Sequence, residues 1–106
     1  MKNIFVIGAG GWGTTLANLL SYQFDVLLWA NEKEVADEIN SLHKNSTYLP
    51  GISLNSKLIA TNSLDEFEQH NVIVNAVPTQ YIRSVFSQLA NTDFSNRILI
   101  NTSKGI

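Results

Sequence analysis

The chain has 106 residues, of which 44% are apolar, and its seven basic and nine acidic side chains leave a formal net charge of -2. This composition predicts one folded domain and excludes an intrinsically disordered chain. The absence of cysteine excludes a disulfide scaffold and a cysteine-bound zinc site, and the mildly acidic balance argues against nucleic acid or a membrane surface as a partner.

The chain begins with an apolar run that ends at a glycine after four residues. Residues 4–7 are too few for the apolar region of a signal peptide and far too few to span a bilayer. We therefore expect a cytoplasmic protein. His43 and His70 have no partners at catalytic or metal-binding spacing, so we expect both at the surface and no metal site.

Strands and helices are predicted to alternate along the chain. Short β-branched and aliphatic runs predict strands at residues 4–7, 26–29, 58–61, 72–76 and 98–101. Apolar residues at helical spacing predict helices within residues 12–20, 35–42 and 82–89.

Polar residues are predicted to begin these helices. Asn31 is a candidate N-cap for the second helix and Thr79 for the last. Ser63, followed by Glu66, predicts a capping box for a short helix between the third and fourth strands.

The predicted strands are nearly continuous apolar runs without polar alternation. Such strands, alternating with helices, predict a parallel sheet covered on both faces, which is the doubly wound, three-layer α/β/α class of the Rossmann type. Residues 43–56 have no periodicity and form a connection so long that we expect it to be either functional or disordered. The chain ends directly after the fifth strand, so we expect residues 1–106 to be one domain of a larger protein.

Residues 8–13 read Gly-Ala-Gly-Gly-Trp-Gly and fit the pattern G-x-G-x-x-G between a predicted strand and a predicted helix. Gly8 permits the tight turn, Gly10 lets the backbone approach a pyrophosphate, and Gly13 lets the helix pack against the strand. The N–H groups of the first helical turn then point at the phosphates. In this context the pattern predicts dinucleotide binding.

Asn31 and Glu32 follow the second predicted strand, where an acidic residue typically accepts hydrogen bonds from the adenosine ribose. Glu32 is therefore a candidate ribose ligand, but it suits the first turn of a helix equally well. Asn31 could contact the ribose or its phosphate, or act only as a cap. With Lys33 adjacent and no arginine in this stretch, the choice between NAD and NADP stays open.

Four stretches of the sequence carry a family resemblance. They are residues 8–13, residues 45–51 (Asn-Ser-Thr-Tyr-Leu-Pro-Gly), residues 75–79 (Asn-Ala-Val-Pro-Thr) with Arg83, and residues 102–105 (Thr-Ser-Lys-Gly). Together they resemble the amino-terminal half of bacterial NAD(P)-dependent glycerol-3-phosphate dehydrogenases. The loop pattern Asn-x-x-Tyr-Leu-Pro-Gly and the Ser-Lys-Gly after the fifth strand are the most particular to this family.

The resemblance implies reversible hydride transfer between NAD(P)H and dihydroxyacetone phosphate, giving sn-glycerol 3-phosphate for glycerophospholipid synthesis. It implies that Gly11 and Trp12 contact the cofactor pyrophosphate and that Asn31, at a position often occupied by Arg or His in relatives, lies near the adenosine ribose. Tyr48 is a candidate cofactor contact, although a loop aromatic before Leu-Pro could instead pack the loop against the sheet.

Lys104 is implied to lie beside both the nicotinamide and the substrate. A lysine just past the carboxyl end of a parallel strand lies where such sheets bind ligands, and its ammonium can stabilise negative charge on a reacting oxygen. A solvated lysine at the end of a strand is the alternative. Pro78 ends the fourth strand beside the same crevice and is either a cofactor contact or only a strand terminator.

The family's general acid/base is a lysine in a helical carboxy-terminal domain, so the resemblance implies no proton-transfer residue within residues 1–106. We therefore expect these residues to bind a dinucleotide without turnover, and the resemblance allows a homodimer through that second domain. Two alternatives stay open. One is the cofactor domain of another two-domain dehydrogenase, such as one acting on a sugar-phosphate acid, and the other is a dinucleotide-sensing module without catalysis.

Overall fold

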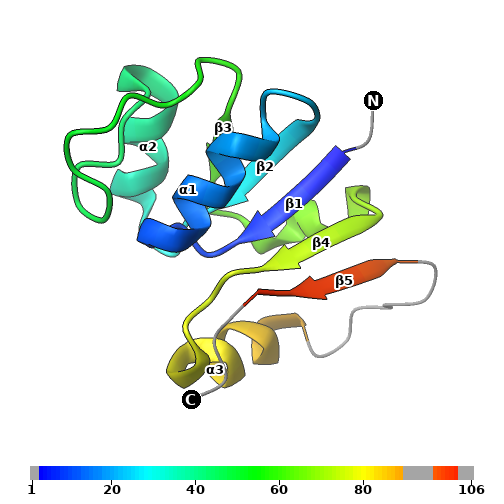
Figure 1. The fold of residues 1–106 in the computed structure, drawn as a ribbon. Coiled ribbons are helices and arrows are strands. Elements are labelled where there is room, and N and C mark those ends of the chain that lie inside the picture. Colours follow the sequence, from blue (N-terminus) through cyan, green and yellow to red (C-terminus); the bar gives the residue numbers. More distant parts are fainter. Residues whose placement is uncertain (1–2, 90–96, 103–106) are drawn as a thin grey trace.

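A computed structural model describes residues 3–89 and 97–102 and contains one five-stranded sheet (Figure 1). All neighbouring strands are parallel, and their order is β3-β2-β1-β4-β5. The strands are β1 (Asn3–Ile7), β2 (Asp25–Trp29), β3 (Ile59–Thr61), β4 (Val72–Asn75) and β5 (Ile98–Asn101). The five predicted strands are confirmed, with bounds that differ by at most one residue: β1 and β2 begin one residue earlier, β3 begins one residue later and β4 ends one residue earlier than predicted.

Helical segments connect the strands on both sides of the sheet. On one side lie α1 (Gly11–Leu20) and α2 (Lys33–Leu42), and on the other lies α3 (Ile82–Phe86) (Figure 1). Short 3₁₀-helices complete the connections at Leu64–Gln69, Thr79–Tyr81 and Ser87–Leu89.

Two apolar clusters show that the sheet is buried on both faces. Val6 of β1 packs in one cluster with Ala17 of α1 and Ile39 of α2. Phe5, the neighbour of Val6 along β1, packs in the other cluster with Val85 of α3. Successive side chains of a strand point to opposite faces, so this division confirms the predicted three-layer α/β/α architecture.

Two of the predicted helix caps are wrong. The carbonyl of Glu32, rather than that of Asn31, accepts the first helical hydrogen bonds of α2, from the N–H groups of Val35 (3.1 Å) and Ala36 (3.3 Å). Thr79 is already the first residue of a 3₁₀ turn, and Pro78 holds the N-cap position.

The predicted capping box at Ser63 is half correct. The Ser63 hydroxyl accepts a hydrogen bond from the N–H of Asp65 (3.3 Å), but the N–H of Ser63 donates to the hydroxyl of Thr61 (3.1 Å) and not to Glu66. The segment that follows is a 3₁₀-helix, whose tighter turn brings the second residue rather than the third to the cap.

The prediction that both histidines lie at the surface is wrong for His70. Its ring is buried and stacks on Phe5 with 5.2 Å between ring centroids, and its Nδ1 lies 2.8 Å from the carbonyl oxygen of Glu66. His43 is half-buried and ends α2 in the left-handed conformation, with φ of 56°.

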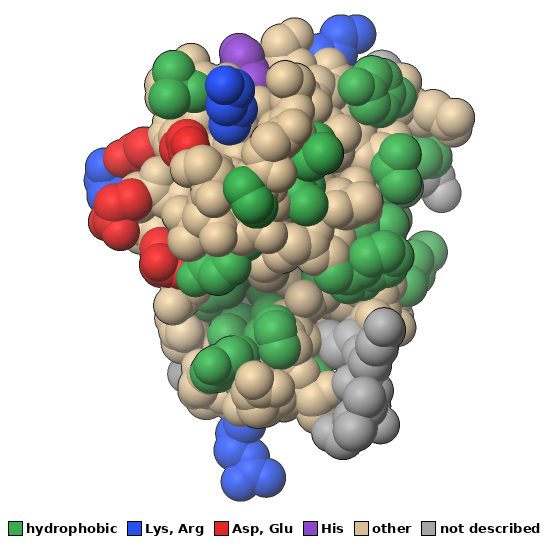
Figure 2. All heavy atoms as spheres, turned by 60° about the vertical axis from the view of Figure 1, so that its left-hand side comes forward, with side chains coloured by type: hydrophobic (Ala, Val, Ile, Leu, Met, Phe, Trp, Pro, Cys, Tyr) green, Lys and Arg blue, Asp and Glu red, His purple; other side chains and the backbone are tan. Residues whose placement is uncertain are grey.

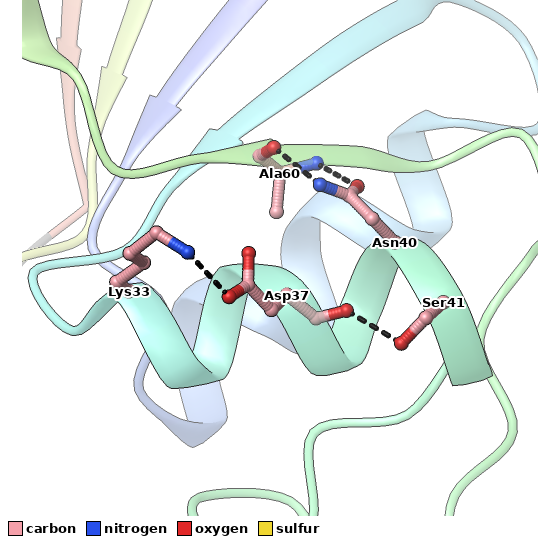
Figure 3. Close-up of polar contacts among 5 residues, drawn as sticks. All are labelled: Lys33, Asp37, Asn40, Ser41 and Ala60. Carbon is pink, nitrogen blue, oxygen red and sulfur yellow. Dashed lines mark hydrogen bonds and ion pairs between the residues drawn. The ribbon is translucent and has the colours of Figure 1, made fainter.

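An asparagine of α2 pairs with the edge strand of the sheet. Asn40 accepts a hydrogen bond from the N–H of Ala60 (2.8 Å) and donates one to the Ala60 carbonyl (2.9 Å), as Figure 3 shows. Its amide thus satisfies backbone groups of β3 that would otherwise lie open at the edge. Within the described part of the chain, no helix is long and apolar enough to cross a membrane, and no cluster of three residues could hold a metal ion.

Candidate functional site

A groove of about 450 Å³ lies at the carboxyl ends of β1, β2 and β4. From β1 the chain adds β2 and then β3 toward one edge of the sheet, and it then returns to add β4 and β5 on the other side of β1. The groove lies at this point, where the direction of the topology switches. Figure 2 shows this hollow, with hydrophobic side chains in and around it and acidic side chains to one side. Its lining residues are Gly8, Ala9, Gly10, Trp29, Ala30, Asn31, Glu32, Val35, Tyr48, Val77, Pro78, Tyr81, Ser84, Val85 and Gln88.

The glycine-rich turn after β1 forms the floor of the groove. Gly8 has φ of +115°, and a Cβ there would lie 3.0 Å from the backbone of Ala76 and Val77. A Cβ on Gly13 would lie 1.8 Å from the carbonyl oxygen of Gly8, so this glycine lets α1 pack against the turn. At Gly10, by contrast, no atom lies within 4 Å of an added Cβ, so its surface is free for a ligand to approach.

The amino terminus of α1 lies directly after Gly10, which holds the N-cap position in an extended conformation. The first helical bond runs from the N–H of Thr14 to the Gly10 carbonyl (3.0 Å), so the N–H groups of the preceding turn have no acceptor within the helix. These groups and the helix dipole make this end of the groove attractive to an anion.

Tyr48 and Glu32 meet at one side of the groove. Glu32 follows β2, Tyr48 comes from the loop after α2, and the Tyr48 hydroxyl donates a hydrogen bond to the Glu32 carboxylate. This hydrogen bond raises the pKa of Tyr48. Tyr48 is 44% exposed, whereas Leu49 packs against the core. Leu49 therefore performs the packing role that the sequence left open for Tyr48.

Asn45 attaches this loop to the glycine-rich turn and is the residue that sequence reasoning missed. It is fully buried, and its amide nitrogen donates to the carbonyl of Ala9 (2.9 Å) and to the hydroxyl of Thr14 (2.8 Å). Its amide oxygen accepts the N–H of Tyr48 (3.2 Å). The signal in the sequence was its place at the start of the Asn-x-x-Tyr-Leu-Pro-Gly pattern, four residues before the apolar Leu49.

The same loop is attached to α2 by Glu38. Its carboxylate accepts hydrogen bonds from the hydroxyl (2.7 Å) and the backbone N–H (3.0 Å) of Ser46. These two bonds lower the pKa of Glu38, the hydroxyl contributing more than the backbone. The loop is thus held at consecutive residues, Asn45 on the turn and Ser46 on the helix.

The opposite wall of the groove follows β4. Asn75 is buried at the end of this strand, and its side-chain oxygen accepts the N–H of Val77 (3.0 Å). Its side-chain nitrogen donates to Asn101 of β5 (3.1 Å). Pro78 then turns the chain into the Thr79–Tyr81 turn, which brings Tyr81 and Val85 to the groove.

The structure brings most of the predicted site residues together. Lining the groove are Gly8, Gly10, Asn31, Glu32, Tyr48 and Pro78. Gly11, Trp12 and Gly13 do not line it, and a Cβ on Gly11 would lie 3.0 Å from the carbonyl oxygen of Tyr48. The Trp12 indole is 55% exposed and donates a hydrogen bond to the hydroxyl of Thr102 (3.1 Å), just past β5. Lys104 lies outside the described residues.

An open parallel sheet in this order, with a glycine-rich turn after β1 and a groove at the switch point, defines a Rossmann-type α/β domain. The family model described as NAD-dependent glycerol-3-phosphate dehydrogenase N-terminus matches residues 3–106. The chain belongs to this family.

Relatives of known name agree with this assignment. The chain is 47% identical over 107 residues to a glycerol-3-phosphate dehydrogenase [NAD(P)+] of Geobacter sulfurreducens, covering 99% of this chain and 32% of the relative. It is 44% identical over 108 residues to the enzyme of that name from Bacillus thuringiensis, covering 100% of this chain and 32% of the relative. The chain thus spans about a third of the length of these curated relatives.

Solved structures show the same fold. The glycerol-3-phosphate dehydrogenase of Saccharomyces cerevisiae matches with a TM-score of 0.89 and 32% identity, over 98% of this chain and 34% of that one. The enzyme from Coxiella burnetii matches with a TM-score of 0.87 and 28% identity, over 99% of this chain and 33% of that one.

Proposed function

We propose that the groove binds NAD(H) or NADP(H), and that the protein carrying it transfers hydride between the nicotinamide and dihydroxyacetone phosphate to give sn-glycerol 3-phosphate. The product would enter glycerophospholipid synthesis. The observation that carries this proposal is the groove at the switch point, with Gly10 open beside the amino terminus of α1, in a chain of this family.

The residues of the groove fit a dinucleotide. The amino terminus of α1 supplies N–H donors for a diphosphate, and open Gly10 lets that group approach the backbone. Asn31 and Glu32 offer acceptors for sugar hydroxyls at the end of β2. Apolar side chains on both walls, including Val35, Val77 and Val85, suit planar rings.

When bound, the nicotinamide supplies or accepts the hydride. The work of residues 1–106 is to bind and orient the cofactor and to keep water from it along the apolar walls. We propose that Lys104, whose place lies outside the described residues, donates a hydrogen bond to the reacting substrate oxygen and stabilises negative charge there. The hydrogen bond from Asn75 to Asn101 holds the ends of β4 and β5 together, and β5 is the strand that leads to Lys104.

We place the proton-transfer lysine in the part of the relatives that this chain does not span. Without it, and without most of the contacts that orient the substrate, residues 1–106 alone should bind the dinucleotide but not turn it over. A homodimer through that part and a cytoplasmic location stay predictions.

The test is oxidation of NADH and of NADPH with dihydroxyacetone phosphate by the full-length polypeptide that carries this chain, with residues 1–106 alone as the control. We expect activity in the full-length polypeptide only, and its loss on Lys104→Ala. Dinucleotide binding by the full-length polypeptide without any reduction of dihydroxyacetone phosphate would contradict the proposed reaction. That result would favour another substrate or a sensing role.

A further inference from the structure

Thr102 joins three segments that lie far apart in the sequence. It directly follows β5, and its side-chain hydroxyl accepts a hydrogen bond from the indole N–H of Trp12 in the first turn of α1 (3.1 Å). The same hydroxyl donates to the backbone carbonyl of Asn75, the last residue of β4 (2.8 Å). The ends of β4 and β5 and the amino terminus of α1 are therefore connected through one side chain.

Each polar atom of Thr102 has a defined role in this connection. An indole N–H can only donate, so the Thr102 hydroxyl oxygen accepts from Trp12, and its one proton goes to the carbonyl of Asn75. The backbone N–H of Thr102 donates to the same carbonyl (2.9 Å). Thr102 is thus held to the neighbouring strand by two hydrogen bonds and to the helix by a third.

Two of the three segments belong to the proposed cofactor site, and the third leads to the proposed substrate ligand. Trp12 lies in the first turn of α1, whose N–H groups are the proposed donors to the diphosphate. Asn75 is followed two residues later by Val77, which lines the groove. Lys104 follows Thr102 by two residues, which span at most about 7 Å of backbone. Fixing Thr102 therefore restricts where the backbone that carries Lys104 can lie.

We propose that Thr102 is a positioning residue for the reaction. Its hydrogen bond with Trp12 holds the segment that carries Lys104 in register with a cofactor bound at the amino terminus of α1. Neither Trp12 nor Thr102 lines the groove, so this bond acts beside the cofactor site and not as part of its lining. The inference rests on the proposed function, because it concerns how the group that binds the reacting substrate oxygen is placed.

The experiment compares Thr102→Val with Thr102→Ser in the full-length polypeptide that carries this chain. Thr102→Val keeps the shape of the side chain without its hydroxyl and should lower kcat/KM for dihydroxyacetone phosphate about tenfold or more, because a displacement of about 1 Å can cost a hundredfold in rate. The dissociation constants of NADH and NADPH, measured by nucleotide fluorescence, should change less than about twofold, since no residue that lines the groove is altered. Thr102→Ser keeps the hydroxyl and should retain most of the activity.

Trp12→Phe tests the same bond without changing Thr102, so the test does not depend on the folding of one variant. It removes the indole N–H, keeps an aromatic ring and should also lower kcat/KM. The double variant should be no less active than Thr102→Val alone, because both substitutions remove the same hydrogen bond. Losses that multiply in the double variant would overturn the proposal.

Thr61→Val is the matched control. Thr61 is another half-buried threonine at the end of a strand, its hydroxyl accepts the N–H of Ser63 (3.1 Å), and it does not line the groove. This variant should keep its kcat/KM, and a loss equal to that of Thr102→Val would overturn the proposal.

Two further results would overturn the positioning role. One is unchanged kcat/KM in Thr102→Val, and the other is a loss of dinucleotide affinity as large as the loss of kcat/KM, which would mean that Thr102 acts on cofactor binding. Failure of the unchanged polypeptide to reduce dihydroxyacetone phosphate would instead overturn the proposed function itself. Circular dichroism confirms that each variant is folded.

Discussion

Gly10 and Gly13 lie three residues apart in one turn and meet different surroundings. A methyl group on Gly13 would press into the carbonyl of Gly8, whereas a methyl group on Gly10 would enter open space at the groove. The same residue type thus serves packing at one position and ligand approach at the other.

Substitution by alanine should therefore affect stability and dinucleotide binding differently at the two glycines. Gly13→Ala should lower the free energy of unfolding by about 3 kcal/mol or more, because backbone must move to admit the methyl group. Gly10→Ala should change it by about 1 kcal/mol or less and still weaken dinucleotide binding at least about tenfold. Urea denaturation and a nucleotide titration measure the two effects, and equal losses of stability would contradict the assignment of roles.

Asn45 both stabilises the fold and holds the loop that carries Tyr48 at the groove. Asn45→Ala would leave the Ala9 carbonyl and the Tyr48 N–H without their partners, at a fully buried position. We expect the free energy of unfolding to fall by about 2 to 3 kcal/mol, measured by urea denaturation. Asn71→Ala is the control, since Asn71 is exposed before β4 and should change stability by less than about 0.5 kcal/mol. Similar losses in both variants would show that Asn45 is not an anchor.

At the scale of elements, the loop after α2 and helix α2 itself are joined by a bond that depends on pH. The two hydrogen bonds from Ser46 hold the pKa of the Glu38 carboxyl below its ordinary value. A carboxyl whose pKa is lower in the folded state stabilises the fold above its unfolded pKa and loses that contribution as the pH falls through the folded pKa. The attachment should therefore weaken only in acid, as the pH falls through this lowered pKa.

Carbon-detected NMR titration of the Glu38 carboxyl tests this attachment. In the unchanged protein the midpoint should lie below the ordinary value of a glutamate carboxyl. Ser46→Ala removes the hydroxyl donor, which is the larger cause of the shift, and should raise the midpoint toward the ordinary value. An unchanged midpoint in Ser46→Ala would mean that the hydrogen bond is absent in solution.

At the scale of the molecule, the fold could be predicted because the same sequence patterns recur in element after element. Each strand is an apolar run, each helix has its own apolar stripe, and a parallel sheet buried on both faces follows from their alternation. The turn at residues 8–13 could be placed as well, because the pattern of glycines depends on local backbone geometry that the flanking strand and helix impose.

Features that depend on contacts distant in the sequence could not be predicted in this way. Asn45 is one polar residue in a loop without periodicity, and only its bonds to Ala9 and Thr14 show its role. His70 was assigned to the surface because no partner stands near it in sequence, whereas it stacks on Phe5 of β1. The hydrogen bond between the Trp12 indole and the hydroxyl of Thr102 likewise joins residues 90 positions apart and has no local signal in the sequence.

The most direct test of the cofactor site maps where a dinucleotide binds. NADH is titrated into the isotopically labelled protein, and the backbone amide shifts are followed by NMR. We expect saturable changes at Gly8, Gly10, Asn31 and Tyr48, with no change at the opposite end of the sheet, for example at Asp25 and Asn71. Saturable binding that leaves Gly10 and Asn31 unshifted, or no binding at all, would contradict the central claim that this groove is the cofactor site.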